Sequence, residues 1–117
     1  MRFWLVLALT GSLAVPASAQ SDTDRRAHSV QCMLAMSAAS GVATNQTAHD
    51  AAKIGMLFFA AQLFGMDPNI DLTAAARAQM PSMTRNKVQA LVAQCGSEMH
   101  ARERQITDAG RGLRQGR

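Results

Sequence analysis

The stretch KIGMLFFAAQLFGMDP, Lys53 to Pro68, is the most apolar run of the chain after its first twenty residues. Between Ile54 and Phe64 its only polar side chain is Gln62, so a helix formed here would be apolar around nearly its whole circumference. The run is shorter than the ~20 residues that a membrane span requires. Such a helix is usually the central one of a small bundle, and we expect it to form the core.

The same run also contains the candidate binding surface. It carries Phe58, Phe59 and Phe64, which are all the aromatic residues after the first twenty positions. A face of this helix that stays outside the core would offer a site for a second copy of the chain or for unfolded client proteins. The candidate residues of this surface are Leu57, Phe58, Leu63 and Phe64.

The first twenty residues, MRFWLVLALTGSLAVPASAQ, are organised as a secretory signal peptide. Arg2 gives the basic start, an apolar segment follows to about Val15, and Pro16 precedes the small residues at 17–19. We expect cleavage after Ala19, which makes residues 1–19 the signal peptide. The rest of the chain, without a membrane span, is expected in a periplasm or outside the cell.

Two cysteines, Cys32 and Cys95, are expected to form a disulfide, because thiols are oxidised in that compartment. Closing so long a loop stabilises a small domain by roughly 4 kcal/mol in the chain-entropy model. A redox pair is typically C-x-x-C, and a structural zinc site needs two further ligands, for which the histidines are the only candidates.

Residues 20–109 are predicted to form a single all-α domain of four helices, cross-linked by this disulfide, because good helix formers dominate. The fourth helix has an apolar stripe, and Gly96 within it suggests that another backbone passes close by. Residues 110–117 are predicted to be a flexible basic tail. The stripe consists of Val88, Leu91, Val92, Cys95, Met99 and Ile106. The first helix is expected from near Asp22 or Asp24 to near Ser40, and the second from Thr47, with a capping box to Asp50, to near Gly65. The third is expected from Asp71 to near Met80, and the fourth starts near Ser82 or Thr84.

The segments VQCMLAM and VQALVAQC, which carry the two cysteines, resemble the small periplasmic acid-stress chaperones of enteric bacteria. That resemblance implies a disulfide-linked helical domain that dimerises at neutral pH and exposes apolar surface to denatured proteins in acid. The segment KIGMLFFAAQLFGMDPNIDL is more similar to a family of small exported all-helical two-cysteine proteins that is itself uncharacterised. This second resemblance implies a fold and no activity.

Two M-x-x-M pairs raise the hypothesis of copper binding. Met33 with Met36, and Met80 with Met83, would each place two thioethers on one helical face, and Cu(I) prefers soft sulfur ligands. Methionine is also a common gap-filler in helical cores, and this is the preferred interpretation. No cofactor is therefore expected.

The three histidines, His28, His49 and His100, have polar or small neighbours and are expected at the solvated surface. The alternative is that His28 and His100 converge on the cysteines as a metal site, since His28 lies one helical turn before Cys32.

Charge is uneven: residues 20–71 contain three basic and five acidic residues, whereas residues 72–117 contain eight basic and three acidic ones. The basic tail is expected to be a solvated segment, and the alternative is weak contact with an anionic surface. Nucleic-acid binding is not expected, because no aromatic residue after Phe64 is present to stack on bases.

Catalytic motifs are missing from the sequence: it has no nucleophile elbow, no H-E-x-x-H and no glycine-rich phosphate loop. The nearest carboxylate pair is Asp67 and Asp71, and Asp71 is expected as a helix cap. The sequence therefore predicts an exported non-enzymatic protein that acts by binding or as a component of the cell envelope. Its candidate partners are a second copy of the chain and envelope proteins. The alternative functions are a chaperone-like holdase that uses the helix around Phe58 and, third, a Cu(I)-binding protein.

Overall fold

A computed structural model describes the backbone of residues 17–116 and the side chains from Asp22 onward. The predicted signal peptide lies outside these residues, except for its last three positions. The described chain is all-α, as predicted, and contains no strand. Its elements are α1 (Ala17–Val42), α2 (Gln46–Met66), α3 (Leu72–Gln79), the short 3₁₀ helix η1 (Met80–Ser82) and α4 (Arg85–Gln115).

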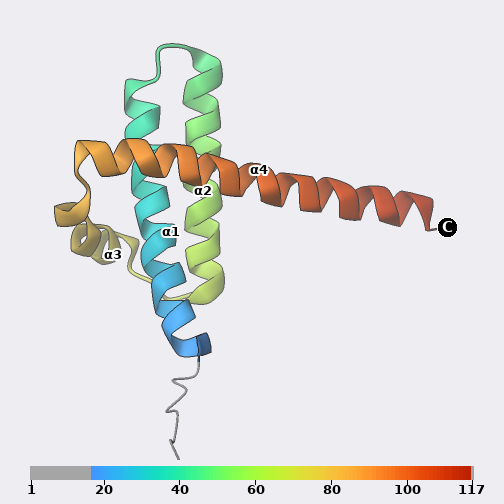
Figure 1. The fold of residues 1–117 in the computed structure, drawn as a ribbon, viewed down its shortest axis with the longest axis horizontal. Helices are drawn as coiled ribbons and strands as arrows, with labels where there is room; N and C mark the ends of the chain where they lie inside the picture. Colours follow the sequence, from blue (N-terminus) through green and yellow to red (C-terminus); the bar gives the residue numbers. More distant parts are fainter. Residues whose placement is uncertain (1–16, 117) are drawn as a thin grey trace, which may run out of the picture.

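The helices α1 and α2 lie side by side as a hairpin, and α3 lies beside α1 (Figure 1). The fourth helix, α4, crosses this hairpin and then projects beyond it. Its 31 residues span ~46 Å. We call its projecting part, residues 102–115, the arm; every residue of the arm except Gly110 is exposed.

The helix starts follow local capping chemistry. Asp71 Oδ1 accepts the N–H of Ala74 at 3.0 Å, so the expected cap is confirmed. Thr84 Oγ1 accepts the N–H of Lys87 at 3.3 Å, so of the two expected starts of the fourth helix, Ser82 and Thr84, the structure has the second. The third helix is expected to end near Met80, and α3 ends at Gln79, where η1 follows.

The capping box predicted from Thr47 to Asp50 is wrong. The N-cap of α2 is Asn45, whose Oδ1 accepts the N–H of Ala48 at 2.8 Å. Asp50 instead accepts a hydrogen bond from Gln46 at 2.7 Å. Asparagine is at least as good an N-cap as threonine, so the helix starts earlier.

The core lies where α4 crosses the hairpin. The predicted disulfide is present between Cys32 of α1 and Cys95 of α4, with Cα atoms 5.7 Å apart and a sequence separation of 63. At the end of the hairpin where α1 begins and α2 ends, Arg26 of α1 forms an ion pair with Asp67, which follows α2. The buried cluster consists of Cys32, Ala35, Met36, Phe59, Leu91 and Cys95.

A close approach of helices occurs at Gly55 of α2. A Cβ atom at this position would lie 2.9 Å from the Sδ atoms of both Met36 in α1 and Met99 in α4. The approach predicted at Gly96 is wrong, because nothing lies within 4 Å of the corresponding position there. Glycine in α2 therefore lets the methionine side chains of two other helices reach its backbone.

The C-terminal end of the chain differs from the sequence prediction. Residues 110–115, predicted as a tail, continue α4 as a helix, and the flexibility of this segment stays a prediction. Arginine, leucine and glutamine favour helix, and Arg114 in the last turn is stabilised by the helix dipole. Among residues 17–116, no helix has the length and apolar character needed to cross a membrane.

Candidate functional site

The apolar run that defines α2 is divided between core and solvent. Phe59 is 1% exposed and Leu63 is fully buried, whereas Ile54, Leu57 and Phe64 are 61%, 62% and 46% exposed. Of the four residues predicted as a partner or client surface, Leu57 and Phe64 are exposed and Phe58 is half-buried. Leu63 belongs to the core, because it lies on the face of α2 that also carries Phe59.

Phe58 lies at the edge of the core under α4. Its ring meets that of Phe59 edge-on, with centroids 5.1 Å apart and an interplanar angle of 88°. It contributes to the lining of two grooves, in which it is joined by different residues of α4.

The larger of these grooves lies between the hairpin and the arm, and we call it the α2–α4 groove. Its volume is about 750 Å³. One wall is formed by Ala48, Ala51 and Ile54 of α2, and α4 contributes Met99 and Ile106. Polar groups enter the lining from α4 alone, at His100, Glu103 and Thr107.

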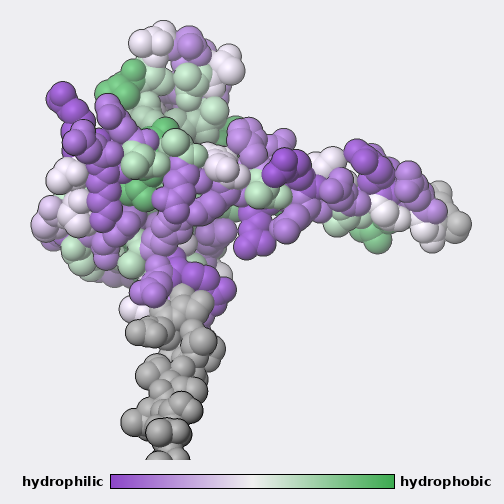
Figure 2. Space-filling view, in the orientation of Figure 1, coloured by the Kyte–Doolittle hydropathy of each residue, from purple (hydrophilic) through white to green (hydrophobic). Residues whose placement is uncertain are grey.

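The surroundings of the α2–α4 groove differ in polarity. Figure 2 shows hydrophobic surface on the part of the hairpin that extends past α4, whereas the arm is largely hydrophilic. Ile106 is 70% exposed although it belongs to the stripe that the sequence predicts along α4. The stripe packs on the hairpin only as far as Met99, and at Ile106 it lines the open groove instead.

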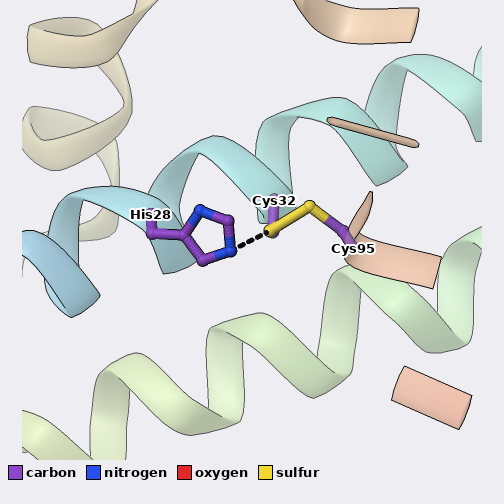
Figure 3. Close-up of side chains that lie close together, drawn as sticks. All are labelled: His28, Cys32 and Cys95. Atoms are coloured by element: carbon purple, nitrogen blue, oxygen red, sulfur yellow. Dashed lines mark hydrogen bonds between the residues drawn. A yellow bond between two sulfur atoms is a disulfide. The ribbon is translucent and has the colours of Figure 1, made fainter. Parts of the chain in front are cut away.

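The smaller groove, with a volume of about 650 Å³, is lined by His28 and Glu98 among others, and we call it the His28 groove. His28 Nε2 lies 3.4 Å from Cys32 Sγ (Figure 3). The same nitrogen lies 2.6 Å from Glu98 Oε1. Both cysteines are fully buried, whereas the side chains of His28 and Glu98 are 31% and 40% exposed.

The predicted histidine pair does not form. Of the two candidates, only His28 reaches the cysteines, while His100 lies in the exposed part of α4 with Nδ1 3.6 Å from Glu103. His49 lies beside Asp50 at the start of α2. The prediction of a solvated histidine is thus wrong for His28, because its side chain contacts Cys32 and Glu98.

The methionines of the M-x-x-M pairs occupy different environments. Met36 is buried, and its sulfur lies beside Gly55, as does the sulfur of Met99 from α4. Met33 and Met83 pack half-buried against the core, and Met80 is exposed. These positions fit gap-filling in a helical core, and Cu(I) binding stays a prediction.

The groove residues that sequence reasoning missed are Ile54 and Ile106 as open walls, and Glu98 as the partner of His28. A signal for Glu98 is its position three residues after Cys95, on the same face of α4.

Comparisons with models of protein families, with curated proteins and with solved structures find no match to this chain, so the resemblances drawn from its sequence stay predictions.

Proposed function

We propose that this protein is an exported, non-enzymatic binding protein that holds apolar segments of other polypeptides in the α2–α4 groove, as a holdase does. The observation that carries the proposal is the groove itself, an open surface of about 750 Å³ with apolar walls from two helices. Contiguous exposed apolar surface of this kind marks sites of protein association.

The chemistry of the walls favours a partner that is apolar but not tightly specified. Alanine side chains at Ala48 and Ala51 make the α2 wall smooth, and Met36 and Met99 give its floor flexible, polarisable side chains. Flexible methionine-rich surfaces adapt to many sequences, because the side chain has three rotatable bonds. A rigid, polar recognition site for one small ligand would instead need several convergent hydrogen-bonding groups.

The charge of the arm adds a second preference. Arg102, Arg104, Arg111 and Arg114 are all exposed on it, against the acidic residues Glu103 and Asp108. A basic helix beside an apolar groove attracts polypeptides in which acidic residues flank the apolar segment. The resemblance to the periplasmic acid-stress chaperones points to denatured proteins as the partners.

The test is a client-aggregation assay with matched variants of α4. Light scattering of a denatured client is followed with and without the protein, at neutral and at mildly acidic pH. We expect wild type to suppress aggregation and Ile106→Asn to suppress it less, since residue 106 lines the groove. Leu113→Asn is the control: Leu113 is 81% exposed on the same arm but lies outside the groove lining, so this change should have no effect.

Both substitutions are at exposed positions, so helicity by circular dichroism should be unchanged. If wild type leaves client aggregation unchanged at both pH values, the proposal is refuted. Equal loss of protection in both variants would show that the groove is not the binding site.

A further inference from the structure

Four side chains with metal-binding donor atoms converge where α4 crosses α1. The imidazole of His28 and the sulfurs of Cys32 and Cys95 offer ligand atoms that all lie within 4.8 Å of one another. A carboxylate oxygen of Glu98 lies 2.6 Å from His28 Nε2 and so adjoins this group of three. Figure 3 shows the imidazole pointing at the disulfide.

We propose that reduction of the Cys32–Cys95 disulfide turns this cluster into a zinc site whose ligands are His28, Cys32, Cys95 and Glu98. Zinc takes four ligands from cysteine sulfur, histidine nitrogen and carboxylate oxygen, which is the donor set present here. In the oxidised chain the two sulfurs are bonded to each other and are not thiolates, so the site exists only after reduction.

The conversion is balanced by a dithiol reductant. The dithiol supplies two electrons and two protons, the bond between the two cysteine sulfurs breaks, and the reductant leaves as its own disulfide. The products in the chain are two thiols. Zinc then binds both sulfurs as thiolates, and the two thiol protons are released to solvent.

The backbone supports a site with this geometry, because each helix supplies two ligands from adjacent turns. His28 and Cys32 are four residues apart on α1, and Cys95 and Glu98 are three residues apart on α4, so each pair lies on one face. Phe59 and Leu91 belong to the same buried cluster as the two cysteines, so apolar contacts add to the sulfur–sulfur bond in holding these faces together. Bound zinc would therefore link α1 to α4 in the reduced chain, as the disulfide does in the oxidised one.

The surroundings also suit the ion. The His28 groove is lined by His28 and Glu98, so zinc can reach these two ligands from solvent before it meets the buried sulfurs. Two thiolates and a carboxylate carry three negative charges, of which zinc neutralises two. One net negative charge remains on the zinc-bound site. Arg25 and Arg102 line the same groove, and their positive charges stabilise it.

The test uses untagged full-length protein, so that no added histidine binds metal. The protein is reduced with a dithiol, freed of the reductant without air, and titrated with zinc against a chromophoric chelator. We expect one ion per chain in the reduced protein and none in the oxidised protein. With Co²⁺ as the probe, thiolate-to-metal charge-transfer absorption and intense visible bands should report a tetrahedral sulfur-containing site.

Variants distinguish this site from binding by the cysteines alone. His28→Ala and Glu98→Gln should each weaken zinc binding at least about tenfold. The control is His100→Ala, which removes an exposed histidine outside the cluster and should leave the affinity unchanged. Circular dichroism shows whether each reduced protein is folded, and zinc should restore helicity if reduction has unfolded the chain. A reduced wild type that takes up no zinc overturns the proposal, as does uptake that both His28→Ala and Glu98→Gln leave unchanged.

Discussion

The close approach at Gly55 predicts opposite effects for one substitution at two glycines. In a helix interior, Gly→Ala by itself stabilises by about 1 kcal/mol. At Gly96 nothing lies within 4 Å of the new Cβ, so Gly96→Ala should gain that amount. At Gly55 the new Cβ would be 2.9 Å from the sulfurs of Met36 and Met99, and overpacking of this kind typically costs about 1–3 kcal/mol.

The net effect of Gly55→Ala is therefore a loss of about 0–2 kcal/mol, because the gain in helix propensity offsets part of the clash. The two variants should differ by about 1–3 kcal/mol in the free energy of unfolding, and Gly55→Ala should melt at least about 4 °C below Gly96→Ala. Thermal unfolding of both oxidised proteins, followed by circular dichroism, measures this. Equal stabilisation by the two substitutions would refute the close approach of the three helices at Gly55.

Two further predictions concern the core and the methionines. Phe59→Ala should lower the free energy of unfolding, measured with denaturant, by about 3–5 kcal/mol, because this ring is fully enclosed. Phe64→Ala, at the half-exposed end of α2, should lower it by less than about 1 kcal/mol. Similar losses in the two variants would contradict the division of this helix into a buried and an exposed face. If the first M-x-x-M pair binds Cu(I), replacing Met33 and Met36 together by leucine should abolish binding in a competition assay while helicity persists, and a wild type that takes up no Cu(I) would end that hypothesis.

The helices were predictable because their signals are local. Asp71 and Thr84 accept the backbone N–H groups expected of N-caps, and the apolar spacing along α4 indicates which face reaches the hairpin. The disulfide was predictable from cysteine number and the expected compartment. The start of α2 was misplaced because Asn45 and Thr47 are both good capping residues, and only one of them can cap.

The division of α2 was not predictable, because a helix that is apolar all round has no pattern that tells one face from another. Whether Leu57 or Phe59 is buried depends on which face of α2 packs against α1 and α4, and that is set by tertiary packing. The same holds for His28 and Glu98, which are 70 positions apart in the chain and meet only because α1 and α4 pack against each other. Gly55 gave no signal either, since its role depends on two methionines from other helices.

The position of the disulfide in the chain has a consequence for cleavage by proteases. Cys32 and Cys95 close a covalent loop that contains α2 and α3, so a single cut inside it, for example after the exposed Arg77 of α3, leaves the two fragments joined until the disulfide is reduced. The arm follows Cys95 and lies outside the loop, so a cut after its first residue, Arg102, releases the rest of it. The oxidised protein can thus lose its arm to a protease in one step, whereas the part that carries the core stays a single covalent unit after being cut.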